Sequence, residues 1–161
     1  MLIGAGVQPT TTSTTDDFGV GQRLLYRDET VGWQEWIWVQ ADAEVEQGEV
    51  CVYKLGTTTY EVILQTVQAA TVLTESAART AGVAQHTIAA ASYGFILQKG
   101  LGEVKADTGA ITANFAIVAG LAGGTAGLAS NFAAGYEHRV IGYATEAAAS
   151  TALATAMIQL G

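Results

Sequence analysis

The sequence predicts an all-β fold: a compact β-barrel or sandwich built of hairpins, with an extended N-terminal arm and little helix. β-branched and aromatic runs alternate with glycine-rich turns along the 161 residues. One hairpin pattern also occurs twice. Gly82-Val83-Ala84 leads through small residues to the strand 95–100, and sixty residues later Gly142-Tyr143-Ala144 leads in the same way to residues 157–161. The echo predicts a domain built from two related halves.

Composition indicates a surface that contacts other protein. Half of the residues are apolar and only 14% are charged, whereas an ordinary soluble domain has about 25% charged residues. We therefore expect an obligate oligomer or a subunit of a larger assembly. The net charge of −8 and the seven scattered basic residues argue against a nucleic-acid partner, because phosphates are bound by clustered Lys and Arg.

A polar tract with the only proline of the chain precedes the first predicted strand. Such a tract has little apolar surface to bury. We expect residues 1–20 to form an extended arm and residues 21–161 to form a single β domain. Residues 1–18 are expected to pack against another chain rather than their own core, with Pro9 and Phe18 as candidate interface residues. A disordered tail is the alternative.

The strongest predicted strand covers residues 33–41, which include all three tryptophans of the chain. Side chains alternate along a strand, so Ile37 and Val39 share one face and Trp36 and Trp38 share the other. Because both faces are apolar, the strand should be covered on both sides. Either it is central to the fold, or Trp36 and Trp38 lie in a subunit contact as interface anchors.

The other elements follow from shorter patterns. Residues 21–29 are predicted as a first strand with its turn, and residues 50–55 and 59–64 as a hairpin that turns through 56–58. The stretch 66–80 is predicted as a connector with one short helical turn.

The uncharged segment 108–136 is as long as a membrane span. Its apolar residues, however, come as the run 115–118, after which repeated glycines interrupt the pattern. This pattern favours a strand and a loop over a membrane helix. We expect no membrane partner.

Candidate catalytic residues are scattered. His86 and His138 are far apart and match no metal-ligand spacing. Adjacent residues of a strand point to opposite faces, so Glu137-His138-Arg139 favours an ion pair at the rim over an acid–base pair. The glycine-rich run 120–125 lacks the Gly-Lys-Ser/Thr of a phosphate loop.

Cys51 is the only cysteine, which excludes an intrachain disulfide and a multi-cysteine zinc site. Its position in a β-branched run indicates a core thiol. Asp42, Glu44 and Glu46 lie along an extended segment, which favours a solvated acidic face over a calcium loop. We expect no enzyme, no cofactor and no metal site.

Several stretches of the chain occur in the order seen in the capsid decoration (cement, or head-stabilising) proteins of tailed bacteriophages, and the chain resembles this family over most of residues 21–161. The stretches are Trp36-Ile37-Trp38-Val39-Gln40-Ala41, Gln47-Gly48-Glu49-Val50, Gly82-Val83-Ala84-Gln85, Tyr93-Gly94-Phe95-Ile96-Leu97-Gln98-Lys99-Gly100, Ala110-Ile111-Thr112-Ala113-Asn114 and Ile141-Gly142-Tyr143-Ala144. The bare segment 108–136 departs from the family pattern.

The resemblance implies a structural, non-catalytic virion protein with a mostly β fold, made in the host cytoplasm. It implies a homotrimer that binds the major capsid protein on the outer surface of the head and stabilises the shell against internal DNA pressure. An N-terminal arm that touches the capsid or a neighbouring subunit fits residues 1–20. The alternatives are another virion module, of the tail or baseplate, and a small-molecule-binding β-barrel or enzyme whose pocket is lined by Trp36, Trp38, Tyr53 and Tyr60.

Overall fold

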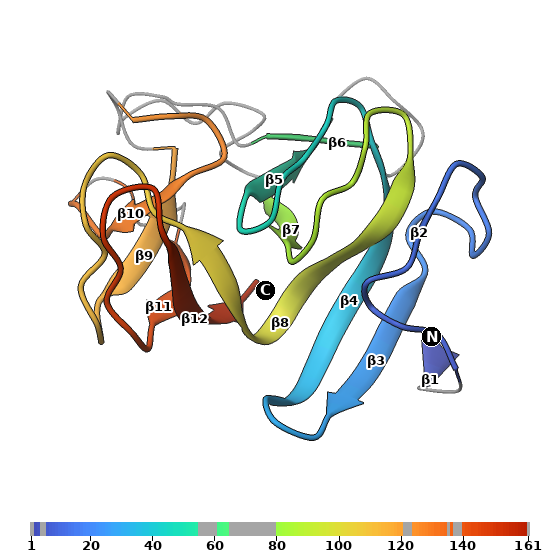
Figure 1. The fold of residues 1–161 in the computed structure, drawn as a ribbon, viewed down its shortest axis with the longest axis horizontal. Helices are drawn as coiled ribbons and strands as arrows, with labels where there is room; N and C mark the ends of the chain where they lie inside the picture. The colour runs from blue at the N-terminus through green and yellow to red at the C-terminus, as the bar shows by residue number, and fades with distance from the viewer. Residues whose placement is uncertain are drawn as a thin grey trace.

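The structure is a computed structural model that describes residues 2–3, 6–54, 61–64, 80–120, 124–134, 136 and 140–160. Among these residues the chain forms strands and no helix (Figure 1), so the prediction of a mainly β fold is confirmed. The strands are β1 (Leu2–Ile3), β2 (Thr12–Ser13), β3 (Arg23–Asp28), β4 (Gly32–Ala41), β5 (Val50–Tyr53), β6 (Glu61–Leu64), β7 (Thr80–Ala84), β8 (Tyr93–Lys105), β9 (Ala116–Ala119), β10 (Ala129–Asn131), β11 (Val140–Ala144) and β12 (Leu153–Gln159).

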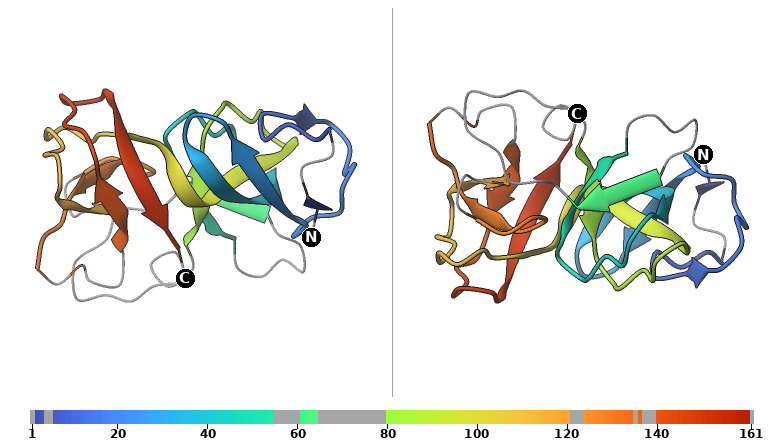
Figure 2. Two further views of the ribbon diagram at one scale, coloured as in Figure 1. Left: turned by 90° about the horizontal axis from the view of Figure 1, so that it is seen from below. Right: turned by 90° about the horizontal axis from the view of Figure 1, so that it is seen from above.

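The strands close into two small barrels that lie end to end (Figures 1 and 2). In the first barrel the order is β4-β6-β5-β7-β8, and the ring closes because β8 also pairs with β4. In the second barrel the order is β8-β12-β11-β9-β10, and a parallel bridge between Ala106 and Ala129 closes the ring. The long strand β8 therefore belongs to both barrels: its first half pairs with β4 and its second half with β12.

The two barrels are copies of one design. In the first, Ala41 pairs with Val62 in parallel and the N–H of Asp42 donates to the carbonyl of Val62 at 3.0 Å. In the second, Ala106 pairs with Ala129 in parallel and the N–H of Asp107 donates to the carbonyl of Ala129 at 2.8 Å. The echo in the sequence is thus part of a duplication of the whole barrel, and the hairpins β7–β8 and β11–β12 occupy equivalent places.

Each barrel also contains two turns of the same conformation. Val45 and Ile88 exchange backbone hydrogen bonds of 3.0 and 2.9 Å in the first barrel, and Ile111 and Ala148 exchange bonds of 2.9 and 3.0 Å in the second. Three residues after each of these positions, the backbone adopts a positive φ. The residues that do so are Gly48, Ala91, Asn114 and Thr151.

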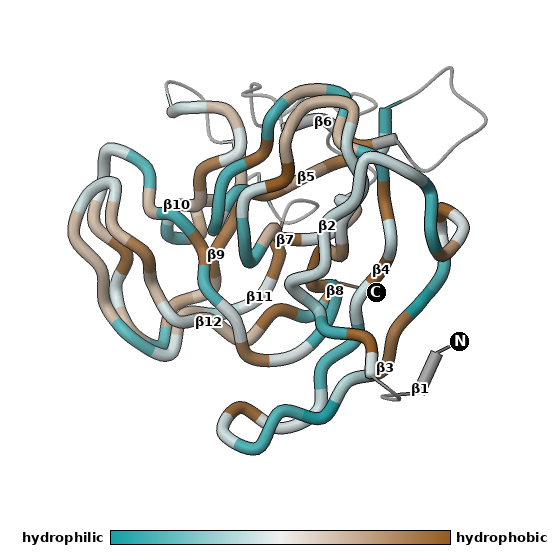
Figure 3. The backbone as a smooth tube through the Cα atoms, turned by 45° about the vertical axis from the view of Figure 1, so that its right-hand side comes forward, coloured by the Kyte–Doolittle hydropathy of each residue, from teal (hydrophilic) through white to brown (hydrophobic). Residues whose placement is uncertain are grey.

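Strand β4 separates two hydrophobic clusters. Ile37 and Val39 point into the first barrel, whereas Trp36 and Trp38 lie on its outside, where a second cluster begins. The prediction that this strand is covered on both sides is confirmed. Along the backbone, hydrophobic residues concentrate in the barrel strands, and hydrophilic ones in the turns and the free end of the β3–β4 hairpin (Figure 3).

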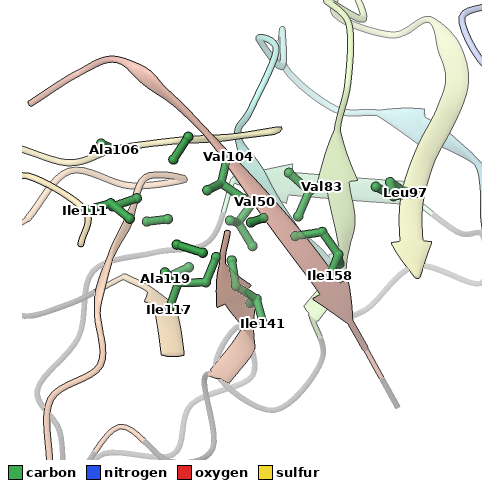
Figure 4. Close-up of a cluster of buried hydrophobic side chains, with 14 of the residues drawn as sticks. Val50, Val83, Leu97, Val104, Ala106, Ile111, Ile117, Ala119, Ile141 and Ile158 are labelled. Atoms are coloured by element: carbon green, nitrogen blue, oxygen red, sulfur yellow. The ribbon is translucent and has the colours of Figure 1, made fainter. Parts of the chain in front are cut away.

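The second cluster continues from the outside of the first barrel into the inside of the second. Val50 and Val83 of the first barrel lie beside Val104 and Ile158 of the second (Figure 4). The N–H of Val50 also donates to the carbonyl of Gly127 across the junction at 2.8 Å. One hydrophobic cluster thus joins the outside of the first barrel to the inside of the second, while the inside of the first barrel contains the other cluster.

The N-terminal arm packs on its own domain, so the expectation that residues 1–18 avoid their own core is wrong for the part that the structure describes. The ring of Phe18 lies edge-on to Trp38, with centroids 4.9 Å apart. A carboxylate oxygen of Asp16 accepts a hydrogen bond of 2.9 Å from the indole N–H of Trp38. β2 pairs with the start of β8, and β1 pairs with β3 in parallel. Phe18 supplies the apolar surface that the threonine tract lacks.

Strands β5 and β6 pair as the predicted hairpin. Its turn at 56–58, and all but the last residue of the connector 66–80 with its expected helical turn, lie outside the described residues.

Candidate functional site

The four predicted interface residues all lie in contacts within the chain. Trp36 is 3% exposed and Trp38 is fully buried, and the arm covers the latter through Phe18. Pro9 is buried and Phe18 is partly buried. Of the two alternatives for the tryptophan strand, the structure shows the buried one.

The candidate catalytic residues are separated or covered. Cys51 is buried, and burial raises the pKa of its thiol far above the usual range. His86 has no hydrogen-bond partner on either ring nitrogen, and burial lowers its pKa. The residues described in the structure contain no group of three His, Cys, Asp or Glu that could hold a metal ion. His138 and its neighbours Glu137 and Arg139 lie outside the described residues.

Within the same part of the chain, no helix has the length and apolar character needed to span a membrane.

Charged side chains concentrate on the first barrel and the junction. The described ion pairs join Lys54 to Asp42 at 2.7 Å, Lys99 to Glu35 at 3.6 Å, and Lys105 to Glu46 at 2.6 Å. Asp42, Glu44 and Glu46 are all exposed, as expected of a solvated acidic face. The hydrogen bond between Lys105 and Glu46 lowers the pKa of the Glu46 carboxyl and raises the pKa of the Lys105 ammonium.

Residues 108–160 contrast with this pattern. The described part of that stretch has one charged side chain, Glu146. Apart from the charged residues of the shared strand β8, Lys99, Glu103 and Lys105, the described surface of the second barrel is therefore almost uncharged.

An exposed tryptophan marks the free end of the β3–β4 hairpin, which projects beyond the first barrel (Figure 1). Trp33 is 58% exposed, and it pairs across the hairpin with Arg27, whose guanidinium carbon lies 5.9 Å from the ring centroid. Trp and Arg are the residues most often found as anchors of protein interfaces. Sequence reasoning assigned Trp33 no separate role. The available signal was its position at the start of the strand, next to the acidic turn 28–29.

A second exposed apolar surface crosses the outside of the second barrel. Leu101 of β8 lies opposite Met157 of β12, Met157 opposite Tyr143 of β11, and Tyr143 opposite Ala116 of β9. Phe132, just after β10, donates its N–H to the carbonyl of Ala116 at 2.7 Å. Directly opposite residues of antiparallel strands point to the same face, so these five side chains form one row. We refer to them as the outer row.

A groove of about 350 Å³ lies where the two barrels meet. Polar and apolar side chains both line it: Gln34, Gln47, Gln85 and Glu103 lie there together with Val31, Trp36 and Leu101. The indole N–H of Trp36 is buried and has no hydrogen-bond partner. Of the residues expected to line a small-molecule pocket, Trp38 and Tyr53 are not part of this groove, and Tyr60 lies outside the described residues.

Comparison with protein-family models gave no match, and comparison with curated proteins gave none. Among solved structures, the chain is similar to the N base of the head fiber gp8.5 of bacteriophage phi29, with a TM-score of 0.53. The two chains are 18% identical, and the match covers 77% of this chain and 92% of the phage chain. At this level of identity, the likeness shows that the two chains share a fold.

Proposed function

We propose that the protein is a structural, non-catalytic component of a bacteriophage head that binds the outer capsid surface as a decoration protein and reinforces the shell. The observation that carries the proposal is the shared fold with a head fiber base of phage phi29. This likeness comes from backbone geometry, whereas the resemblance to decoration proteins comes from short motifs such as Gly82-Val83-Ala84-Gln85. Both lines of reasoning point to the phage head.

The surface supports a binding role. Exposed Trp33 and the outer row offer apolar side chains at two separate places, and the described part of residues 108–160, which supplies four of the five residues of the outer row, has a single charged side chain. The core of a protein interface is depleted of charged residues and enriched in aromatic ones. The hydrophobic cluster that joins the two barrels makes the body that presents these surfaces rigid.

In the proposed mechanism the protein acts as a homotrimer, and each trimer bridges several copies of the major capsid protein. A standard contact buries roughly 1,600 Å² in total. Once one contact of a trimer has formed, the remaining binding surfaces are held at a high effective concentration near their partners. The attachment of the whole trimer is therefore strong, although the affinity of each contact is moderate. Outward pressure on the shell would then have to break many contacts at once.

Trp33 is our candidate for the anchor on the capsid, in place of the buried Trp36 and Trp38. Its hairpin extends beyond the barrel, and the ring is the most exposed large apolar side chain of the described residues. The matched control is Phe115, which is 53% exposed on the second barrel.

The test uses phage heads from which the protein has been stripped. Adding it back should raise the temperature at which the heads rupture, and cryo-electron microscopy should place it on the outer shell. Trp33→Ala should weaken binding to heads at least tenfold, about 1.4 kcal/mol, whereas Phe115→Ala should leave it unchanged. Heads that keep full stability without the protein, or density located on the tail, would refute the proposal.

The comparison supports a second candidate within the same particle, namely a base that attaches a fiber to the head. The N base of the phi29 head fiber is matched over 92% of its length. The same micrographs distinguish the two roles, because a base would carry a fiber that extends away from the shell.

A further inference from the structure

The duplication of the barrel gives each residue of the outer row an equivalent in the first barrel. In the first barrel Trp36 lies opposite Leu97, and Leu97 opposite Val83, which in turn lies opposite Val50. This register repeats that of the outer row. The equivalents of Leu101, Met157, Tyr143 and Ala116 are therefore Trp36, Leu97, Val83 and Val50, which we call the inner row.

The inner row is covered by another β-barrel. Trp36 is 3% exposed, and Leu97, Val83 and Val50 are fully buried. Figure 4 shows these three aliphatic side chains together with Ile158 and other residues from inside the second barrel. Within one molecule, the outer face of the first barrel that carries the inner row thus already binds another barrel.

The outer row has no such cover within the described chain. Tyr143 is 41% exposed and Phe132 is 38% exposed, while Met157 and Leu101 are partly exposed. The alternate residues of β12, such as Ile158, are buried inside the second barrel. The row is therefore an apolar face left in water, and contiguous faces of this kind mark contacts with protein.

We propose that the outer row is the surface through which the chain binds a second copy of itself. The contact repeats between chains the contact that joins the two barrels within one chain, with a barrel of the neighbouring copy over the outer row. Lys99 and Glu103 flank Leu101 on β8, but the other four residues of the row lie in residues 108–160, whose described part has one charged side chain, Glu146. This part of the row suits a partner that is itself poorly charged, as this chain is, with 14% charged residues. The proposal rests on the self-association that belongs to the proposed function.

The symmetry of the contact follows from the inner row. Because the inner row is already buried within its own chain, the neighbouring copy must offer a different surface to the outer row. A contact between two different surfaces is head-to-tail, and it closes into a ring when the rotation between copies permits. A ring of three copies is the homotrimer of the proposed function.

The experiment places charge in the row and measures the mass of the full chain in solution, without heads. In sedimentation velocity at tens of micromolar, the wild type should form an oligomer of the 16.6 kDa chain. The double variant Tyr143→Lys/Met157→Lys should sediment as a monomer, with self-association weakened at least a hundredfold. The control is Trp33→Lys, which places one positive charge at an exposed aromatic of the first barrel and should leave the oligomer intact.

Two results would overturn the inference. One is a wild type that stays monomeric at several hundred micromolar; the other is a double variant that keeps its native circular dichroism and still forms the wild-type oligomer. If the double variant does not fold, the milder Tyr143→Ser gives the same comparison. Binding to heads is measured separately, so a monomer that still stabilises heads would refute this contact and leave the proposed function standing.

Discussion

Removal of the Phe18 side chain tests how firmly the N-terminal arm is bound to its own domain. The ring contacts Trp38 with centroids 4.9 Å apart and Phe95 with centroids 5.5 Å apart. Truncation of a fully buried Phe to Ala costs about 3–5 kcal/mol. Phe18 is partly buried, so we expect Phe18→Ala to lower the free energy of unfolding by about 2–3 kcal/mol, which includes its aromatic pairs at about 0.5–1.5 kcal/mol each.

A second change in the arm separates packing from hydrogen bonding. Asp16→Ala removes the acceptor at 2.9 Å from the indole N–H of Trp38, and an unsatisfied buried donor costs about 1–3 kcal/mol. Because Asp16 and Phe18 act on the same ring, the double variant should lose less than the sum of the two single losses. Thr10→Ala, at an exposed position of the same arm, should stay within about 0.5 kcal/mol of the wild type.

Urea denaturation at one fixed protein concentration measures the wild type and all four variants. In thermal melts, the loss for Phe18→Ala corresponds to about 4–12 °C for a chain of this length. A Phe18→Ala protein within about 0.5 kcal/mol of the wild type would show that the arm does not contribute to the core and would restore the earlier expectation of an arm bound elsewhere.

Two further predictions concern the barrels. Gly142→Ala should lower the free energy of unfolding by about 3 kcal/mol or more in urea denaturation, because the new Cβ would collide with the carbonyl oxygen of Met157 at a backbone φ of +155°. The control is Gly109→Ala, where a Cβ meets nothing within 4 Å. Equal losses in the two variants would contradict the reasoning. Burial raises the pKa of Glu49 above its ordinary 4.5, so its ionisation reduces stability as the pH rises from 4.5 through the raised value. Glu49→Gln, which can still accept from the N–H of Glu46, should therefore raise the Tm at pH 7.5 and leave it nearly unchanged at pH 4; the same gain at both pH values would count against a buried charge as the cause.

Much of the architecture is readable from the sequence where residue identity itself repeats. The strand openings Gly82-Val83-Ala84 and Gly142-Tyr143-Ala144 keep their glycines, because a side chain at either glycine would collide with the neighbouring strand. The alternation along residues 33–41 likewise identified the two buried faces of β4.

The full duplication cannot be recognised from the sequence, because its other parts share backbone conformation but not residue identity. The turns at Gly48 and Asn114 share a positive φ but no sequence pattern. Val45 and Ile111 share a buried position that many apolar residues satisfy. Backbone hydrogen bonds define these turns, and such bonds leave little trace in the side chains.

The alternation of side chains along β4 also does not predict which of its residues are exposed to solvent. Trp33 and Ile37 share one parity on β4, yet Trp33 is 58% exposed and Ile37 is 2% exposed, because the hairpin continues past the end of the barrel. The position of the arm depended on a single aromatic residue, Phe18, after a polar tract. Which tryptophan meets water is decided by the length of the hairpin and by the route of the arm, and neither has a local signature.

The strand shared by the two barrels has a consequence for how this protein can change over generations. A protein made of two independent domains joined by a linker can lose either domain and keep the other folded. Here a cut within β8 would leave both rings open, since the first half of the strand completes one ring and the second half completes the other. A mutation that disrupts β8 should therefore destabilise both barrels. The two halves therefore have to keep one strand that suits both, and a substitution in β8 is constrained by both barrels at once.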